Sequence, residues 1–201
     1  MLPKGQFYSR NWILYSALGQ PEVDIKSYRL RISGNVENPF SLTYEQLKEK
    51  ATVEYTSDFH CVTKWSIKDV RWKGVSLRAL LEEARPKGDS EWVVFLCLDG
   101  YSAPVPLEDA LDERAIIAIE MNGKPLRPEQ GFPARPFIPH LYGWKSAKWV
   151  TEVHVVRSYI DGYWERYGYH ERGNVYLEER FKGQEWRKVK KSVAGTLKAQ
   201  D

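Results

Sequence analysis

Short strand-like segments that run into tight-turn dipeptides recur along this chain of 201 residues. Residues 28–33 alternate between apolar and polar side chains before Gly34-Asn35, and the apolar segment 92–98 precedes Asp99-Gly100. Alternation with a period of two is typical of half-buried strands, and these dipeptides favour tight turns. The pattern predicts a β-rich fold. Further strands are predicted over residues 51–59, 101–105, 115–120 and 148–156, and another tight turn at Asn122-Gly123.

The helices predicted from this sequence are short. Thr43 and Gln46 have the spacing of a capping box, which predicts a helix that ends at Lys50. Ser76 is a good N-cap for residues 77–84, whose apolar side chains recur with helical spacing. Shorter helical turns are predicted over residues 107–111 and 159–167. We therefore expect an α+β fold, mixed and rich in β-strands, with short helices.

Two segments are predicted to lack long regular elements. Residues 1–25 carry Gly5, Gly19 and Pro21 as breakers and are predicted to form an irregular arm. Residues 123–146 contain many prolines and glycines, with basic side chains between them. Binding residues tend to lie on long, shaped loops of this kind.

The composition fits one domain over residues 1–201, with 42% hydrophobic and 28% charged residues. The net charge of +3 permits an anionic ligand without demanding nucleic acid. No secretory signal or membrane-spanning run is visible, so we expect a cytoplasmic protein, although a processed chain would look the same. The tail from about residue 182 is basic, and a surface helix or frayed end is a better interpretation of it than a nucleic-acid contact; its basic residues include Arg187, Lys188, Lys190 and Lys191.

Cys61 lies between a predicted strand and the segment Val62-Thr63-Lys64-Trp65. A thiol among such side chains can be reactive, whereas most unpaired cysteines are simply buried. A disulfide with Cys97, the one other cysteine, is possible from the sequence alone. The four histidines lack the paired spacing of a zinc site. The residues alone therefore leave both the structural and the chemical interpretation open.

Three basic residues, Arg135, Lys145 and Lys148, lie in and just after the proline-rich segment. Arginine donates several hydrogen bonds in one plane and lysine supplies a compact charge, so the three could hold a phosphate group. The alternative is a set of solvated charges on a polar loop.

Taken with the segment around Cys61, these residues resemble the molybdopterin-binding domain of the sulfite oxidase family, and especially its small stand-alone oxidoreductases. The resemblance covers about residues 5–181 and rests on the order and spacing of several motifs. These motifs are the segments 34–39, 60–66, 72–75, 99–101, 121–126, 131–135 and 143–149.

In that family one cysteine thiolate ligates molybdenum, and the resemblance assigns this role to Cys61. A buried phosphate would need the positive charges of Arg135 and Lys148. The resemblance thus implies a molybdenum-molybdopterin cofactor held by the following residues: Asn11, Trp12, His60, Cys97, Gln130, Arg135, His140, Lys145, Ser146, Ala147 and Lys148.

The sequence departs from sulfite oxidases where the substrate would bind. Asp161 falls where the family has a tyrosine, and its carboxylate would repel sulfite unless Tyr159, Tyr163 or Tyr167 takes that place. The chain has no room for the haem or dimerisation domains of larger relatives. The resemblance therefore implies a separate electron-transfer partner, a haem or flavin protein.

The function that the resemblance implies is oxygen-atom transfer by a molybdenum-dependent oxidoreductase. Its substrate would be small: a sulfite-like anion, a sulfoxide or an N-oxide. The alternative is a non-catalytic binding domain of the same fold that recognises a protein or nucleic-acid partner. The presence of Cys61, Arg135 and Lys148 in one chain favours the enzyme.

Overall fold

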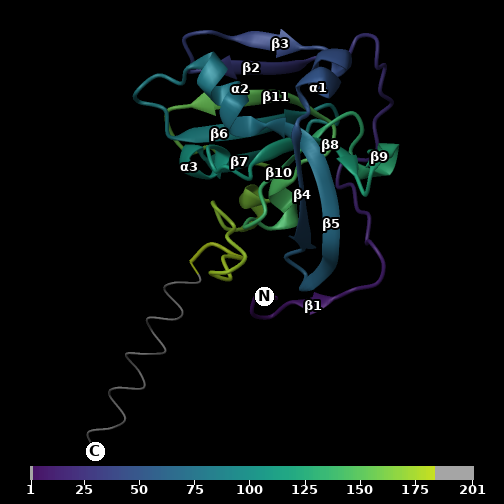
Figure 1. Cartoon of the computed structure of the whole chain (residues 1–201). Coiled ribbons are helices and arrows are strands. Elements are labelled where there is room, and N and C mark those ends of the chain that lie inside the picture. Colours follow the sequence, from purple (N-terminus) through teal and green to yellow (C-terminus); the bar gives the residue numbers. More distant parts are fainter. Residues whose placement is uncertain (1, 184–201) are drawn as a thin grey trace, which may run out of the picture.

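Two β-sheets with a few short helices around them make up the part of the chain that the computed structural model describes, residues 2–183 (Figure 1). This architecture confirms the expected α+β class. The basic residues predicted for the tail, Arg187, Lys188, Lys190 and Lys191, lie outside the described residues. Within residues 2–183, no helix is long and apolar enough to span a membrane.

The first sheet is built around β5 (Trp65–Ser76), a strand of 12 residues. It pairs with three other strands, β1 (Phe7–Tyr8), β4 (Val53–His60) and β8 (Ile116–Met121), and β8 also pairs with β9 (Lys124–Pro125) and β10 (Arg135–Phe137). We did not expect β5 from the sequence. Its two ends are buried, but exposed charged residues interrupt its middle, so neither a continuous apolar run nor a clean alternation marks it: Lys68, Asp69 and Arg71.

The second sheet has β11 (Val150–Val156) at its centre, parallel to β2 (Leu30–Gly34) and antiparallel to β6 (Trp92–Cys97). β3 (Phe40–Leu42) and β7 (Ser102–Pro106) lie at its two edges. Every strand predicted from alternation and turn dipeptides is present within a few residues of its expected position. The largest apolar cluster of the core includes side chains from this sheet, β8 and α2 (Leu77–Ala84).

The helix caps formed as the sequence predicts. In α1 (Tyr44–Lys50), the Gln46 backbone N–H donates to Thr43 Oγ1 over 3.1 Å, and the Thr43 N–H donates to Gln46 Oε1 over 2.8 Å. Ser76 caps α2 by accepting from the Ala79 N–H at 3.2 Å. The third helix, α3 (Leu107–Ala110), is a single turn.

The aromatic helix expected over residues 159–167 is wrong except for its last turn, the 3₁₀ helix η3 (Glu165–Tyr167). Before this turn the backbone bonds to the neighbouring strand β7, because the Tyr163 N–H donates to the Ser102 carbonyl at 2.9 Å. Residues 123–146 lack long elements, as expected, and contain only β9, β10 and the 3₁₀ turns η1 (Pro128–Gln130) and η2 (Gly143–Lys145).

Gly74 marks the closest approach of β5 to β8. A Cβ atom at this position would lie 2.2 Å from the Ile117 carbonyl oxygen, which is backbone and cannot rotate away. We expect Gly74→Ala to lower the free energy of unfolding by about 1–3 kcal/mol, the usual cost of overpacking. Gly88→Ala is the matched control, because nothing lies within 4 Å of its Cβ position. Urea denaturation measures both, and equal midpoints for the two variants would contradict the expectation.

Candidate functional site

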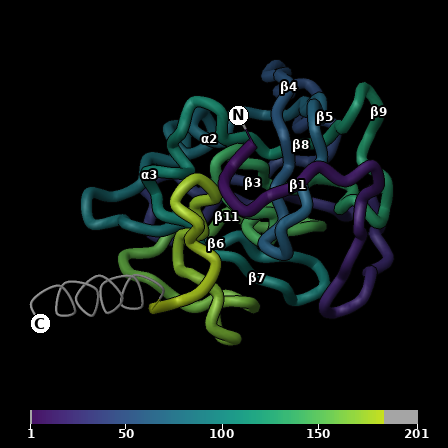
Figure 2. The backbone as a smooth tube through the Cα atoms, turned by 90° about the horizontal axis from the view of Figure 1, so that it is seen from below, coloured from purple at the N-terminus to yellow at the C-terminus, as the bar shows by residue number. Residues whose placement is uncertain are grey.

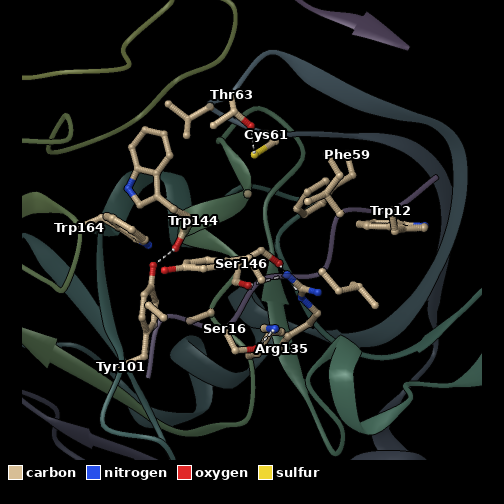
Figure 3. A pocket seen from close by; sticks show the side chains of 18 of the residues that line it. Trp12, Ser16, Phe59, Cys61, Thr63, Tyr101, Arg135, Trp144, Ser146 and Trp164 are labelled. Atoms are coloured by element: carbon tan, nitrogen blue, oxygen red, sulfur yellow. Dashed lines mark hydrogen bonds between the residues drawn. The ribbon is translucent and has the colours of Figure 1, made fainter. Parts of the chain in front are cut away.

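A cavity of about 370 Å³ opens beside the loop that carries Cys61. This volume is within the range of small-molecule and cofactor sites. The cavity walls come from segments far apart in the sequence, namely residues 12–17, 59, 61–63, 65, 99, 101, 135, 143–144, 146–149, 164 and 169 (Figure 3).

Cys61 stands in the tight connection from β4 to β5. The Cys61 N–H donates to the Trp65 carbonyl at 2.9 Å, and the Lys64 N–H donates back to the Cys61 carbonyl at 3.1 Å. The Cys61 Sγ atom is half-buried, lies 3.1 Å from Thr63 Oγ1 and lines the cavity. Both cysteines are free, because Cys97 is buried in the main core.

The Arg135 guanidinium is buried at the base of the cavity and bonded only to uncharged oxygens. Its Nε and Nη2 atoms donate to Ser146 Oγ at 2.9 Å and to the Ser146 carbonyl at 2.7 Å, and Nη1 donates to the Gln130 carbonyl at 2.9 Å. Burial lowers the pKa of Arg135 to about 10. Within residues 2–183 it forms no ion pair, so its charge is uncompensated by the protein.

Lys148 adds a second positive charge to the same end of the cavity. Its Nζ donates to Ser16 Oγ at 2.6 Å and to the Glu129 carbonyl at 3.2 Å. Burial, followed by repulsion from Arg135, lowers the pKa of Lys148 to about 8. Asp99 also lines the cavity, and burial raises the pKa of its carboxyl group. No other charged residue of the described chain lines the cavity.

The cavity is therefore polarised, with a thiol at one end and cations at the other. Figure 3 shows Cys61 and Thr63 at the first end, and Arg135 with Ser16 at the opposite end. Aromatic rings form the side walls: Trp12 and Phe59 on one side, and Tyr101, Trp144 and Trp164 on the other. A ligand that fills this space meets a positive charge, an apolar middle and a thiol in that order.

Six of the residues that the sequence assigned to the site line this cavity: Trp12, Cys61, Arg135, Ser146, Ala147 and Lys148. The other six do not line it, and their contact with a cofactor stays a prediction. His60 follows Phe59 in β4, so its side chain points to the opposite face, where Nδ1 lies 2.8 Å from Ser66 Oγ. Cys97 belongs to the core, and Asn11 is exposed on the arm.

Gln130 reaches the site only through Arg135, and His140 bonds to a residue outside the cavity lining. The Gln130 carbonyl holds Arg135, and its side-chain Oε1 accepts the Arg127 N–H at 2.8 Å. His140 Nε2 lies 2.8 Å from Asp109 Oδ1, away from the cavity.

Lys145 is buried away from the cavity, whereas Lys148, three residues further along the same segment, lines it. The Lys145 Nζ is fully enclosed and donates to Glu165 Oε1 and to the Pro104 carbonyl, both at 2.7 Å. Glu165 Oε1 also accepts the Trp144 indole N–H at 2.8 Å. Burial lowers the pKa of the Lys145 ammonium, and the Glu165 carboxylate opposes that shift. Lys145 therefore holds the wall that carries Trp144 and does not face a ligand.

Asp161 and the tyrosines that could take the place of the family tyrosine also lie outside the cavity lining. Asp161 accepts from the Tyr159 hydroxyl at 2.5 Å and from Lys182 Nζ at 2.6 Å, and none of Asp161, Tyr159, Tyr163 and Tyr167 lines the cavity. Sequence reasoning did not assign most of the aromatic residues that line the cavity to the site, because no local pattern shows which rings of an aromatic-rich chain face inward: Tyr15, Phe59, Trp65, Tyr101, Trp144, Trp149, Trp164 and Tyr169. Asp99 was missed as well, although it precedes a glycine at a strand end.

Comparison with known proteins assigns a family to this fold and site. The profile described as the oxidoreductase molybdopterin binding domain matches residues 17–164. The chain belongs to this family, which confirms the resemblance seen in the sequence. It is therefore an oxidoreductase that uses molybdenum-molybdopterin.

Individual relatives agree with this assignment. The chain is 39% identical over 158 residues to the uncharacterized oxidoreductase YuiH of Bacillus subtilis, covering 79% of this chain and 80% of that protein. It is 28% identical to the protein-methionine-sulfoxide reductase catalytic subunit MsrP of Campylobacter jejuni, covering 74% and 55% of the two chains. The sulfane dehydrogenase SoxCD of Paracoccus pantotrophus has a similar structure, with a TM-score of 0.64 at 25% identity, covering 75% and 42%. The chain thus spans about half the length of the last two proteins.

The residues present fit such a cofactor. A pterin phosphate is an anion, and Arg135 and Lys148 are two cations at one end of the cavity that no carboxylate within residues 2–183 pairs with. Molybdenum accepts soft thiolate ligands, and Cys61 presents a half-buried free thiol at the other end. Among the described residues there is no group of three or more His, Cys, Asp and Glu side chains that could hold a metal ion.

The buried Lys145–Glu165 pair should be sensitive to loss of one partner. Glu165→Gln leaves the enclosed Lys145 without a compensating charge, and we expect a loss of about 3–5 kcal/mol in the free energy of unfolding. The matched control is Glu120→Gln, which breaks the partly exposed pair with Lys73 and should cost about 0–1 kcal/mol. Urea denaturation of the metal-free protein compares the two. Similar losses in both variants would show that the buried pair is not special.

Anion binding at the cation end should depend on pH. Lys148 is charged below a pKa of about 8 and neutral above it, so sulfate should raise the melting temperature of the metal-free protein less as the pH passes upward through 8. Chloride at equal ionic strength controls for screening, and Lys148→Met should remove the pH-dependent part. Sulfate keeps its charge across this range, so a sulfate effect that is the same on both sides of pH 8 would contradict the role of Lys148.

Proposed function

We propose that this protein catalyses oxygen-atom transfer between its molybdenum cofactor and a small uncharged oxo-compound, a sulfoxide or an N-oxide, with electrons exchanged with a separate partner. The observation that carries the proposal is the polarity of the cavity. All of its positive charge lies at the end away from Cys61, and the thiol end is apolar and aromatic.

The cation end would bind the cofactor. Arg135 and Lys148 would hold the phosphate, with the Ser146 hydroxyl keeping the guanidinium in place. Asp99, on the same side as Lys148, has a carboxylate that can accept N–H groups from the pterin edge. Cys61 would ligate the metal, and when bound the cofactor supplies the two-electron oxygen-transfer chemistry. The twelve residues first assigned to the site are reduced by this proposal to six, with Asp99 added.

The thiol end determines which substrate can approach. Trp144 and Trp164 lie 5.2 Å and 5.0 Å from the Tyr169 ring, measured between ring centroids, and among the described residues no charged side chain lines the cavity beside Cys61. Burial raises the pKa of the Tyr169 hydroxyl, and the nearby Cys61 adds to that shift, so the phenol stays protonated as a hydrogen-bond donor. A sulfite-like anion would meet no cation here. A sulfoxide or N-oxide oxygen could accept from Tyr169 while its apolar groups contact the rings.

The overall reaction fits a protein that takes electrons from elsewhere. Reduction of a sulfoxide consumes two electrons and two protons and releases a sulfide and water. The name of the relative MsrP, a protein-methionine-sulfoxide reductase, supports this substrate class. We further propose that the electrons come from a haem or flavin protein and that the enzyme acts in the cytoplasm.

Cys61→Ser tests the metal-binding part of the proposal. Protein purified from cells that make molybdopterin should contain close to one molybdenum per chain, and the variant should lose most of it, because a hydroxyl is a poor substitute for a soft thiolate. Cys97→Ser is the matched control and should keep its molybdenum, since Cys97 is buried in the core away from the cavity. Elemental analysis gives the result, and full molybdenum retention in Cys61→Ser would overturn the assignment.

The substrate class can be tested with a panel of compounds and a reduced viologen dye as electron donor. Aryl sulfoxides and N-oxides should be reduced, and sulfite oxidation with ferricyanide should be at least about tenfold less efficient in kcat/KM. Trp164→Ala should lower kcat/KM for aryl sulfoxides by about tenfold through lost contact area. Tyr159→Ala, from the same segment but outside the cavity, is the control. Efficient sulfite oxidation with no sulfoxide reduction would contradict the proposal.

A further inference from the structure

The loop that carries Cys61 is held by side chains from both ends of the described chain. Gln6 Nε2 donates to the Cys61 carbonyl at 3.1 Å, to the Trp65 carbonyl at 3.3 Å and to Ser66 Oγ at 3.0 Å. Arg180 Nη1 donates to the Val62 carbonyl. Consecutive carbonyls at the site, those of Cys61 and Val62, are therefore fixed from outside the loop.

The two holding residues are also bonded to each other. Arg180 Nη2 donates to Gln6 Oε1 at 2.9 Å, and both side chains are buried. The Arg180 guanidinium also packs over the Tyr142 ring, with its carbon 4.9 Å from the ring centre. Figure 2 shows the purple N-terminal segment and the yellow C-terminal segment next to each other, although the two residues are 174 positions apart in the sequence.

The backbone around Gln6 is built for this contact. Gly5 has a φ of +74°, and a Cβ atom there would lie 3.3 Å from Arg180 Nη2, so a larger residue would press on the guanidinium. The following strand β1 pairs in parallel with the start of β5, and the Phe7 N–H donates to the Lys64 carbonyl at 2.9 Å. These bonds place the Gln6 amide directly over the loop.

We propose that Gln6 and Arg180 are positioning residues that fix the direction of the Cys61 thiol. Both lie outside residues 17–164, the part matched by the molybdopterin-binding family, so segments beyond the family domain complete the site of this chain. The inference rests on the proposed role of Cys61 as a metal ligand. A thiolate whose backbone is locked at two successive carbonyls keeps one orientation toward the cavity without help from the cofactor.

The reactivity of the Cys61 thiol in metal-free protein tests this directly. Gln6→Ala and Arg180→Gln should each raise the rate of Cys61 alkylation by iodoacetamide about fivefold or more, because a released loop opens locally. Peptide mapping separates Cys61 from Cys97, which is buried and serves as an internal reference. Arg180→Lys should restore part of the protection, since an ammonium can still donate to one of the two oxygens.

Two controls come from the same segments. Arg172→Gln removes a guanidinium that bonds the Asp109 carboxylate at 2.7 Å and does not contact the loop. Lys4→Ala breaks an exposed ion pair with Glu178 that joins the two terminal segments without touching Cys61. Neither control should change the alkylation rate. Rates for Gln6→Ala and Arg180→Gln equal to wild type, or an equal rise in Arg172→Gln, would overturn the proposal.

Molybdenum retention separates this proposal from the proposed function. Loaded Gln6→Ala and Arg180→Gln should lose molybdenum on dialysis several times faster than wild type, whereas Arg172→Gln should not. If Cys61→Ser keeps its metal, the ligand assignment fails whatever the alkylation rates show. If Cys61→Ser loses its metal, but Gln6→Ala and Arg180→Gln retain theirs and show the wild-type alkylation rate, only the positioning role fails.

Discussion

A buried guanidinium that has no carboxylate partner within residues 2–183 sets the conditions for the rest of the site. Arg135 can remain charged in the interior because three neutral oxygens surround it, and these oxygens come from the turn at Gln130 and from Ser146. The turn at Gln130 and the backbone at Ser146 must keep their positions to satisfy these hydrogen bonds, and this fixes the base of the cavity. Lys148 then joins a region that is already positive, and repulsion from Arg135 adds to the burial that lowers the pKa of its ammonium. The two positive charges at this end of the cavity therefore favour the binding of an anion.

Local sequence signals predicted the elements well and part of the site. The capping boxes, turn dipeptides and alternating strands all depend on neighbours within four residues, and they formed as expected. Cys61, Arg135 and Lys148 were also brought into one cavity, as the family motifs implied. Lys145 shows the limit of such reasoning. It is three residues from Lys148 and has the same side chain, but distant partners, the Glu165 carboxylate and the Pro104 carbonyl, hold it inside the protein.

The remaining parts of the site depend on contacts that no local pattern reports. The strand β5 is central to its sheet yet carries charged residues in its middle, since one face of that stretch is open to solvent. The aromatic wall is similar: Trp164 and Tyr169 line the cavity, whereas Tyr163 and Tyr167, in the same segment, do not. Which ring faces inward follows from where the backbone bonds to β7, and this is a tertiary property.

The N-terminal arm gives the cavity a kinetic property as well as a shape. Residues 12–17 line it, yet residues 9–29 contain no helix or strand, and the Lys148–Ser16 hydrogen bond joins the arm to the cation end. A bulky ligand that enters or leaves this end has to displace the arm and break that bond. The lifetime of a bound cofactor would then depend on how often this arm moves aside, and not only on how strongly the two cations attract the cofactor.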